Sequence, residues 1–257
     1  MTAPLREATG FTIIFKSADG EAKSTINSTE EGIYMTNKPD IILPELQVDA
    51  IEILGRNSTI TYNYGCYRDR QITLNLVAKD YNSFNKLLCF IGLFNGVSST
   101  GTIEFNYMRY LPNTVNLAYC YRFKPGIIYT TRDAKGIPEV DLQLTLEPFA
   151  YATQKKFITT TGDFWCESEV ETPFLLNIQG AGDIWINGEK ITVTESLILD
   201  TELMIAYARE NNIYTNKGTK CKCNMTKLKL KPQKNNTITK SSGITSFSLS
   251  YWPTFFR

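Results

Sequence analysis

Histidine is missing from this sequence of 257 residues. Its absence removes the most common general base, proton shuttle and metal ligand of proteins, and it excludes Ser-His-Asp and Cys-His catalysis. Zinc knuckles of the Cys-x2-Cys type are also missing, because only Cys221 and Cys223 of the six cysteines lie close together in the sequence. We therefore expect no metal, no cofactor, and six thiols without disulfides that lie mostly in the core.

Long apolar runs and an excess of charge are lacking as well. The sequence has no run of about 18 apolar residues, which a membrane-spanning helix needs, and its N-terminus lacks the pattern of a signal peptide. The formal net charge is only +1, so no long-range attraction toward nucleic acid or acidic membranes is expected. These absences favour a protein that folds in a cytoplasm and has neither a membrane nor a specific nucleic acid as its partner.

The charges are nevertheless unevenly distributed along the chain. Residues 217–240 hold eight lysines and no acid, whereas residues 163–210 are rich in acids. A nucleic-acid-binding patch usually also contains arginines and interleaved aromatic residues, and these do not accompany the lysines. We interpret the segment as a solvated, lysine-rich hairpin that faces an acidic neighbour.

What the chain does contain is a regular alternation of apolar and polar residues, which is typical of strands. The clearest example is 70–78, where Ile72, Leu74 and Leu76 point to one face. Further strands are predicted at 11–15, 32–35, 47–54, 101–105, 116–121 and 139–147, with turns at 55–58 and a strand end at Pro148. A domain boundary is expected near residue 150.

One helix is predicted at residues 80–94. Asp80 or Asn82 caps its start by accepting a backbone N–H, and Asn95-Gly96 ends it. Such a helix either docks a partner or lies across a sheet, and we favour the second interpretation. Its apolar stripe is expected at Tyr81, Phe84, Leu88 and Ile91, widened by Leu87 and Phe94.

The second half of the chain reads as many short strands separated by tight turns, which is typical of a β-sandwich. The predicted strands are 156–160, 174–178, 183–186, 191–194, 196–199, 225–230 and 244–251, with turns at 179–182 and 187–189. We therefore predict a mainly β fold: an α+β N-terminal domain at residues 1–150, with one helix and a hairpin, followed by a β-sandwich domain at residues 151–257.

Few residues suggest catalysis. Asp200 and Glu202 flank Thr201, so their carboxylates share one face of a strand, as paired acids of a glycosidase or a calcium site do. Glycosidase acids usually come from separate elements, however, and we interpret these two as residues of a turn or strand end. The Gln179–Asp183 segment lacks the spacing of a phosphate-binding loop and is interpreted as a turn.

Two tryptophans suggest a different function. Trp165 and Trp185 either fill the core of the sandwich or form an exposed platform on which sugars stack. The second interpretation makes the chain a carbohydrate-binding β-sandwich module, and it remains the alternative to a purely structural role.

Taken in order, the short motifs resemble the distal tail protein (Dit) family of long non-contractile phage tails. The stretch from Leu46 to Asn57 and the strand at 70–78 are similar to the family's early strands, and 140–151 is similar to the close of its N-terminal domain. The C-terminal motifs are Ile-Asn-Gly at 186–188, Leu-Asp-Thr-Glu at 199–202, Pro-x-x-Asn at 232–235 and Tyr-Trp-x-x-x-Phe-Arg at 251–257. The chain departs from the family at Gln233, where a glycine is common, and in ending on a single arginine.

The resemblance implies a function that the residues alone do not give. It implies a non-enzymatic structural hub of a tail-tip baseplate, a homohexameric ring built by the N-terminal domains, and a galectin-like C-terminal sandwich. The implied partners are other copies of the chain, the tail tube protein, the tail-associated tip or lysin protein, and in some phages tape-measure and receptor-binding proteins. The implied location is the tail tip of a virion that is assembled in the host cytoplasm.

Overall fold

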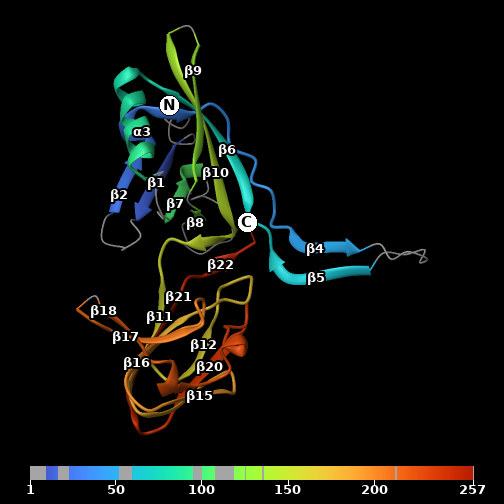
Figure 1. Ribbon diagram of the computed structural model, residues 1–257, viewed down its shortest axis with the longest axis vertical. Coiled ribbons are helices and arrows are strands. Elements are labelled where there is room, and N and C mark those ends of the chain that lie inside the picture. The colour runs from blue at the N-terminus through green and yellow to red at the C-terminus, as the bar shows by residue number, and fades with distance from the viewer. Residues whose placement is uncertain are drawn as a thin grey trace, which may run out of the picture. The chain divides into compact units, whose positions relative to one another are not determined.

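The structure, a computed structural model, describes residues 10–16, 23–51, 60–94, 100–107, 119–124, 126–134, 136–211 and 213–256. The chain divides into two compact units (Figure 1). Unit 1 contains Met1–Tyr151 together with Phe256–Arg257, and unit 2 contains Ala152–Phe255. The predicted turn at 55–58, the predicted helix end at 95–96 and the start of the predicted strand 116–121 lie outside the described residues.

Unit 1 is built on an antiparallel sheet with the strand order β2-β1-β7-β8-β10-β6-β3, in which β9 also pairs with β10. Its faces alternate as predicted on β6, where Ile72, Leu74 and Leu76 are all buried. The strands are β1 (Phe11–Lys16), β2 (Lys23–Asn27), β3 (Ile33–Met35), β6 (Arg70–Ala78), β7 (Thr100–Phe105), β8 (Tyr119–Phe123), β9 (Ile128–Ala134) and β10 (Ile137–Ala152). The predicted mainly β fold is confirmed.

Strand β10 is longer than predicted. It continues through Pro148 to Ala152, so the expected strand end at Pro148 is wrong. Proline is excluded from a strand only where its missing N–H is needed by the ladder. The antiparallel register of β10 with β6 ends at Leu146↔Arg70, so Pro148 lies beyond that ladder.

The long helix α3 (Tyr81–Phe94) begins as predicted, because the backbone N–H of Ser83 donates to Oδ1 of Asp80 at 2.8 Å. Its buried face differs from the prediction. Leu87, Phe90 and Ile91 are buried, whereas Tyr81 is 52% exposed, so the stripe centres on Leu87 rather than Leu88. The rings of Phe90 and Phe15 pack edge to face at 5.0 Å, so the helix covers the sheet. A short helix, α2 (Ser28–Glu31), was not predicted.

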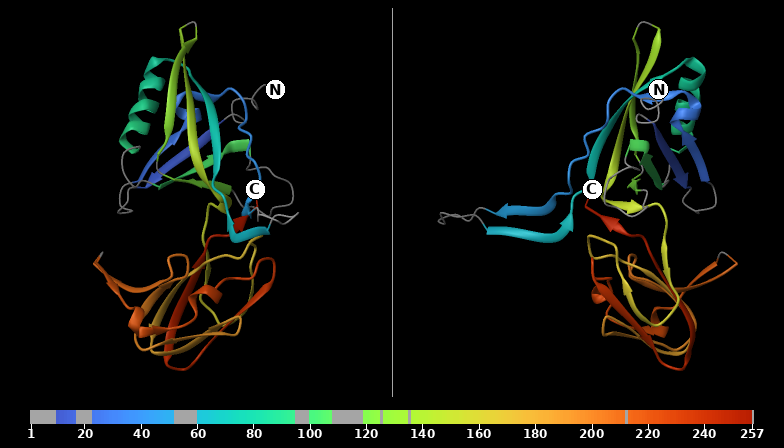
Figure 2. Two further views of the ribbon diagram at one scale, coloured as in Figure 1. Left: turned by 45° about the vertical axis from the view of Figure 1, so that its right-hand side comes forward. Right: turned by 180° about the vertical axis from the view of Figure 1, so that it is seen from behind.

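Unit 2 is a sandwich of two antiparallel sheets around one apolar core (Figure 2). The first sheet has the order β11-β21-β13-β16-β17-β18 and the second β12-β20-β14-β15-β19. The strands of the first are β11 (Lys156–Ile158), β13 (Leu175–Gly180), β16 (Leu197–Asp200), β17 (Ile205–Glu210), β18 (Ile213–Asn216) and β21 (Ile244–Tyr251). Those of the second are β12 (Gly162–Trp165), β14 (Gly182–Ile186), β15 (Glu189–Val193), β19 (Cys221–Lys222) and β20 (Asn235–Lys240).

Two C-terminal predictions need correction. Residues 225–230 do not form a strand: η3 (Met225–Lys227), like η2 (Gly218–Lys220), is a 3-10 turn, closed by a bond from the Leu228 N–H to the Met225 carbonyl at 3.2 Å. Leu228 and Leu230 are nevertheless buried in the apolar core of unit 2. The aromatic C-terminal segment does not belong entirely to the last strand of the sandwich. Strand β21 ends at Tyr251, a short strand β22 (Thr254–Phe255) follows, and Phe256 belongs to unit 1.

Candidate functional site

Unit 1 contains a two-stranded hairpin with exposed apolar side chains, formed by β4 (Leu46–Ile51) and β5 (Ile60–Tyr67) and here called the arm (Figure 1). The sequence predicts strand 47–54 from its clean alternation, yet only Gln47 of β4 is even partly buried. Apolar residues are therefore exposed on both faces of the arm. With the segment leading into it, the exposed set is Ile42, Leu43, Leu46, Val48, Ile51, Tyr62 and Tyr64.

The arm is held in shape by contacts among its own polar and aromatic side chains. The Tyr64 hydroxyl donates to Oδ2 of Asp49 at 2.7 Å, and this hydrogen bond raises the pKa of Tyr64. The Tyr62 and Tyr64 rings pack edge to face at 4.8 Å, and Arg68 lies 4.0 Å from Asp49. The aliphatic side chains of the arm take no part in these contacts and are exposed.

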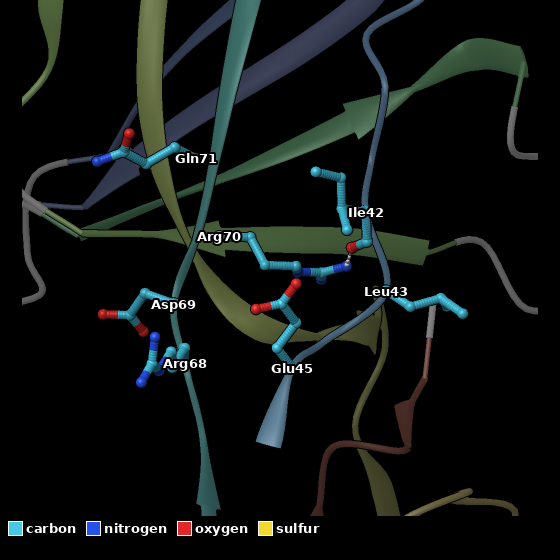
Figure 3. A pocket seen from close by; sticks show the side chains of 7 residues that line it. All are labelled: Ile42, Leu43, Glu45, Arg68, Asp69, Arg70 and Gln71. Atoms are coloured by element: carbon cyan, nitrogen blue, oxygen red, sulfur yellow. Dashed lines mark hydrogen bonds between the residues drawn. The ribbon is translucent and has the colours of Figure 1, made fainter. Parts of the chain in front are cut away.

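Arg70 fixes the base of the arm to the sheet (Figure 3). Its side chain is only 6% exposed, and burial lowers its pKa. Nη1 donates to the Ile42 carbonyl at 2.9 Å, and Nη2 lies 3.5 Å from the Glu147 carbonyl. The guanidinium also stacks 5.2 Å from the centre of the Tyr121 ring. The segment leading into β4 is thus tied to β6, β8 and β10 at one point.

A hollow of about 240 Å³ lies beside this anchor. It is lined by Ile42, Leu43, Glu45, Arg68, Asp69, Arg70 and Gln71. Side chains of both charge signs and two exposed aliphatic side chains, Ile42 and Leu43, meet there.

A cluster of three aromatic side chains lies in unit 1 at the end of the arm strand β5. Tyr67 at the end of β5, Phe149 on β10 and Phe256 near the chain end meet with ring centres 5.1–5.4 Å apart. Three edge-to-face contacts of this kind add stabilisation beyond the buried area. Distant parts of the sequence therefore converge on the same end of β5 that Arg70 anchors.

The structure places Asp200 at the end of β16, directly before a turn, in agreement with the predicted turn or strand end. Its Oδ1 accepts hydrogen bonds from the backbone N–H groups of Glu202 and Leu203, both at 3.0 Å. The intervening Thr201 is buried, and its hydroxyl bonds to both backbone polar groups of Phe174. Within the described ranges, no cluster of three or more cysteine or acidic side chains suits a metal ion.

Trp165 and Trp185 lie on the outward face of the same sheet. Trp165 pairs with Asn235 of β20, and Trp185 with Thr239 of the same strand. Trp165 is 56% exposed, whereas Trp185 is half-buried beneath the Lys190 ammonium, which lies 5.7 Å from the ring. Because their partners are four residues apart, the two indoles are separated by about 13 Å along the strand direction. They are two separate aromatic side chains rather than one continuous platform.

The lysine-rich segment does face acidic neighbours. Lys217 lies 2.7 Å from Glu195, and Lys229 lies 3.6 Å from Glu171. The bond to Lys217 lowers the pKa of Glu195. These pairs support the interpretation of the segment as a solvated structural face.

The cysteines are reduced, but their predicted burial is only partly correct. Cys120 and Cys166 are buried, Cys66 and Cys89 are exposed, and Cys221 and Cys223 are intermediate. Burial raises the pKa of the Cys166 thiol, which makes it unreactive.

Sequence reasoning missed the most highly connected buried polar side chain of unit 2. Asn236 is 0% exposed, and its amide makes four hydrogen bonds of 2.7–3.0 Å. They join it to the Asn187 side chain and to the backbone of Lys231 and Lys234. The Pro-x-x-Asn motif drew attention to Asn235, which is exposed.

Among the residues that the structure describes, no helix is long and apolar enough to cross a bilayer.

Comparison with known proteins gives matches of structure only. No protein-family model matches the sequence, and no curated protein matches it. The Dit protein of phage SPP1, described as a hub of the adsorption apparatus, superposes with a TM-score of 0.59 at 12% identity, covering 95% of this chain and 99% of that one. A chain of the phage P2 baseplate in its activated conformation gives 0.50 at 7% identity, covering 95% and 97%. The chain therefore has the fold of the SPP1 distal tail protein, as its resemblance to that family implied.

Proposed function

We propose that the chain is a non-enzymatic structural subunit of a bacteriophage tail tip, and that six copies form a ring at the hub of the baseplate. The shared fold with the SPP1 and P2 proteins supports a structural role in a baseplate. In this proposal the N-terminal domain at residues 1–150 builds the ring, and the C-terminal domain at residues 151–257, a galectin-like sandwich, serves as its outer part.

The arm is the observation that carries the proposal. Isolated two-stranded hairpins are marginally stable in water, and soluble monomers rarely expose a contiguous apolar patch without a function. The arm nevertheless exposes aliphatic side chains on both faces, including Val48 and Ile51. A neighbouring copy of the chain that packs against the arm removes these side chains from water and stabilises the hairpin.

The ring is tested by placing charge on the arm. We expect the parent chain to assemble into a species of six times the mass of one chain, alone or with its tail-tip partner. The Val48→Asp/Ile51→Asp variant should remain monomeric, because burying two unpaired carboxylates costs several kcal/mol for each charge, or about a thousandfold or more in association. Light scattering coupled to size-exclusion chromatography measures the mass, and negative-stain imaging shows the ring.

The matched control is Ile213→Asp on β18 of unit 2. Ile213 is 68% exposed, which is comparable to Ile51 at 52%, but it lies outside the arm. This variant should assemble normally, and circular dichroism should show all variants folded. A parent chain that stays monomeric even with the partner, or an arm variant that assembles fully, contradicts the proposal.

The other partners follow from the same role. A hub subunit contacts the tail tube protein on one side and the tail-associated tip or lysin protein on the other, and tape-measure or receptor-binding proteins are further candidates. Its location is the tail tip of the virion, after assembly in the host cytoplasm. Co-expression with each candidate protein, followed by copurification, tests these contacts one at a time.

Carbohydrate binding by unit 2 is a second candidate function. It is favoured by the placement of both Trp165 and Trp185 on the outward face of one sheet. Because a stacking contact on an aromatic ring is worth about 0.5–1.5 kcal/mol, we expect Trp165→Ala to weaken glycan binding by up to about tenfold and Trp185→Ala somewhat less. A glycan array with the parent chain is the measurement, and a complete lack of hits removes this candidate while leaving the ring untouched.

A further inference from the structure

Outside the arm, Cys221 and Cys223 bring two thiols close together. Their Sγ atoms lie 3.7 Å apart, and both side chains are about half-buried against the edge of the unit 2 core. A disulfide needs a sulfur–sulfur distance of about 2 Å, so the two atoms need to approach by less than the diameter of one atom.

The backbone around the pair suits such an approach. Cys221 is on β19, paired with Val193 of β15, and Cys223 lies one residue beyond the strand end, before η3. Residues two apart on a strand share a face, with Cα atoms about 6.6 Å apart, which is within the range found in disulfides. The bend after Lys222 leaves freedom to shorten that distance.

The pair is also accessible and chemically asymmetric. Strand β19 is the last in its sheet, so one side of it is unpaired by other described strands. The two thiols share one hydrogen bond, which lowers the pKa of Cys223 and raises that of Cys221. Cys223 is therefore the thiol of the pair that more readily loses its proton to give the thiolate, the form that attacks disulfides.

We propose that Cys221 and Cys223 form a reversible redox site that closes into an intramolecular disulfide by exchange with a small organic disulfide. The Cys223 thiolate attacks one sulfur of the small disulfide, and the other half leaves as a thiolate. Cys221 then loses its proton to solvent and attacks the Cys223 sulfur in the mixed disulfide, which expels the second half as a thiolate. The small disulfide and the two protein thiols are thus converted into a protein disulfide and two small thiols, so the electrons balance.

Closing this disulfide affects only its own segment, and the role given to it below rests on the proposed function. A ring of this size removes little entropy from the unfolded chain, so the bond fixes the 221–223 segment rather than the whole unit. A disulfide that closes so small a ring is strained and is therefore readily reduced. A tail protein moves from a reducing cytoplasm to an oxidising exterior, so the segment is open during assembly and closed in the released particle.

The test uses the full-length Cys66→Ser/Cys89→Ser variant, from which the two exposed cysteines have been removed. It is equilibrated in graded mixtures of reduced and oxidised glutathione, quenched with acid, and alkylated after unfolding. We expect a mass loss of about 2 Da with two alkylatable thiols lost together, mapped to the peptide containing Cys221 and Cys223, and full reversal by dithiothreitol.

Adding Cys221→Ser to the same background is the matched control. With no resolving thiol, Cys223 should accumulate a stable glutathione adduct and never the internal bond. The proposal is overturned if the background variant keeps all its thiols, stops at the mixed disulfide, or forms only dimers linked between chains. None of these outcomes bears on ring formation, so failure here is distinguishable from failure of the proposed function.

Discussion

Replacing Asn236 by leucine is expected to destabilise unit 2 by about 3–5 kcal/mol, the largest effect of any single polar side chain in that unit. The amide is fully buried, and its Oδ1 accepts from Asn187 at 2.7 Å and from the Lys231 N–H at 2.8 Å. Its Nδ2 donates to the Lys231 and Lys234 carbonyls, both at 3.0 Å. Leucine has a similar volume but leaves these groups unsatisfied, at about 1–3 kcal/mol each.

Thermal unfolding followed by calorimetry measures this loss. A domain of this size loses about 4–8 °C in Tm for each kcal/mol, so the unit 2 transition should fall by at least roughly 12 °C. Asn235→Leu is the matched control, because Asn235 is the exposed neighbour on the same strand. Equal melting of the two variants would show that the network around Asn236 contributes nothing beyond its surroundings.

The faces of central strands were predictable because their burial follows the two-residue period. On β6 the apolar residues fall on one side, and the structure buries them as the sequence predicts. The same period misleads for β4, since the alternation 47–51 looks half-buried but both faces are exposed. Periodicity reports which residues share a face, and it does not report whether anything covers that face.

The helix shows a related limit. The helical spacing of the apolar residues is compatible with a buried face centred on either Leu87 or Leu88. Including the aromatic Tyr81 in that face favoured Leu88, which is not the centre in the structure. The choice was made by long-range contacts, above all the packing of Phe90 on Phe15. The start of the helix, which depends on a local bond from the Ser83 N–H to Asp80, was predictable.

The candidate site could be predicted only in part for the same reason. The resemblance to tail proteins pointed to a ring, but Arg70 looked like an ordinary first residue of a strand. Its role depends on the carbonyls of Ile42 and Glu147, which are 28 and 77 residues away. Asn236 was missed likewise, because buried polar networks have no periodic signature in a sequence.

Adding one methyl group at Gly101 is expected to destabilise unit 1 by about 3 kcal/mol. Gly101 sits on β7 directly between Phe15 of β1 and Phe123 of β8 in the antiparallel register. A Cβ atom placed there would lie 2.1 Å from the ring of Phe123. That ring cannot move aside, because it is fully buried and packs edge to face on Phe15 at 5.2 Å.

The measurement compares Gly101→Ala with Gly92→Ala by denaturant unfolding. Gly92 is on the exposed side of α3, and a Cβ atom there meets nothing within 4 Å. Gly92→Ala should therefore raise stability by about 0.5–1 kcal/mol through helix propensity, while Gly101→Ala lowers it. The two substitutions add the same atoms, so opposite signs isolate the effect of the clash from that of the residue type.

A double-mutant cycle assigns the loss to the Phe123 ring. In a Phe123→Leu background the flat ring is gone, so Gly101→Ala should cost at least about 1 kcal/mol less than in the parent, which is a coupling expected only of residues in contact. Equal costs in both backgrounds would mean that the methyl group strains the β7 backbone and not the aromatic packing. Because Phe15 also contacts Phe90 of α3, a genuine clash should loosen the helix too, which amide exchange along Tyr81–Phe94 detects.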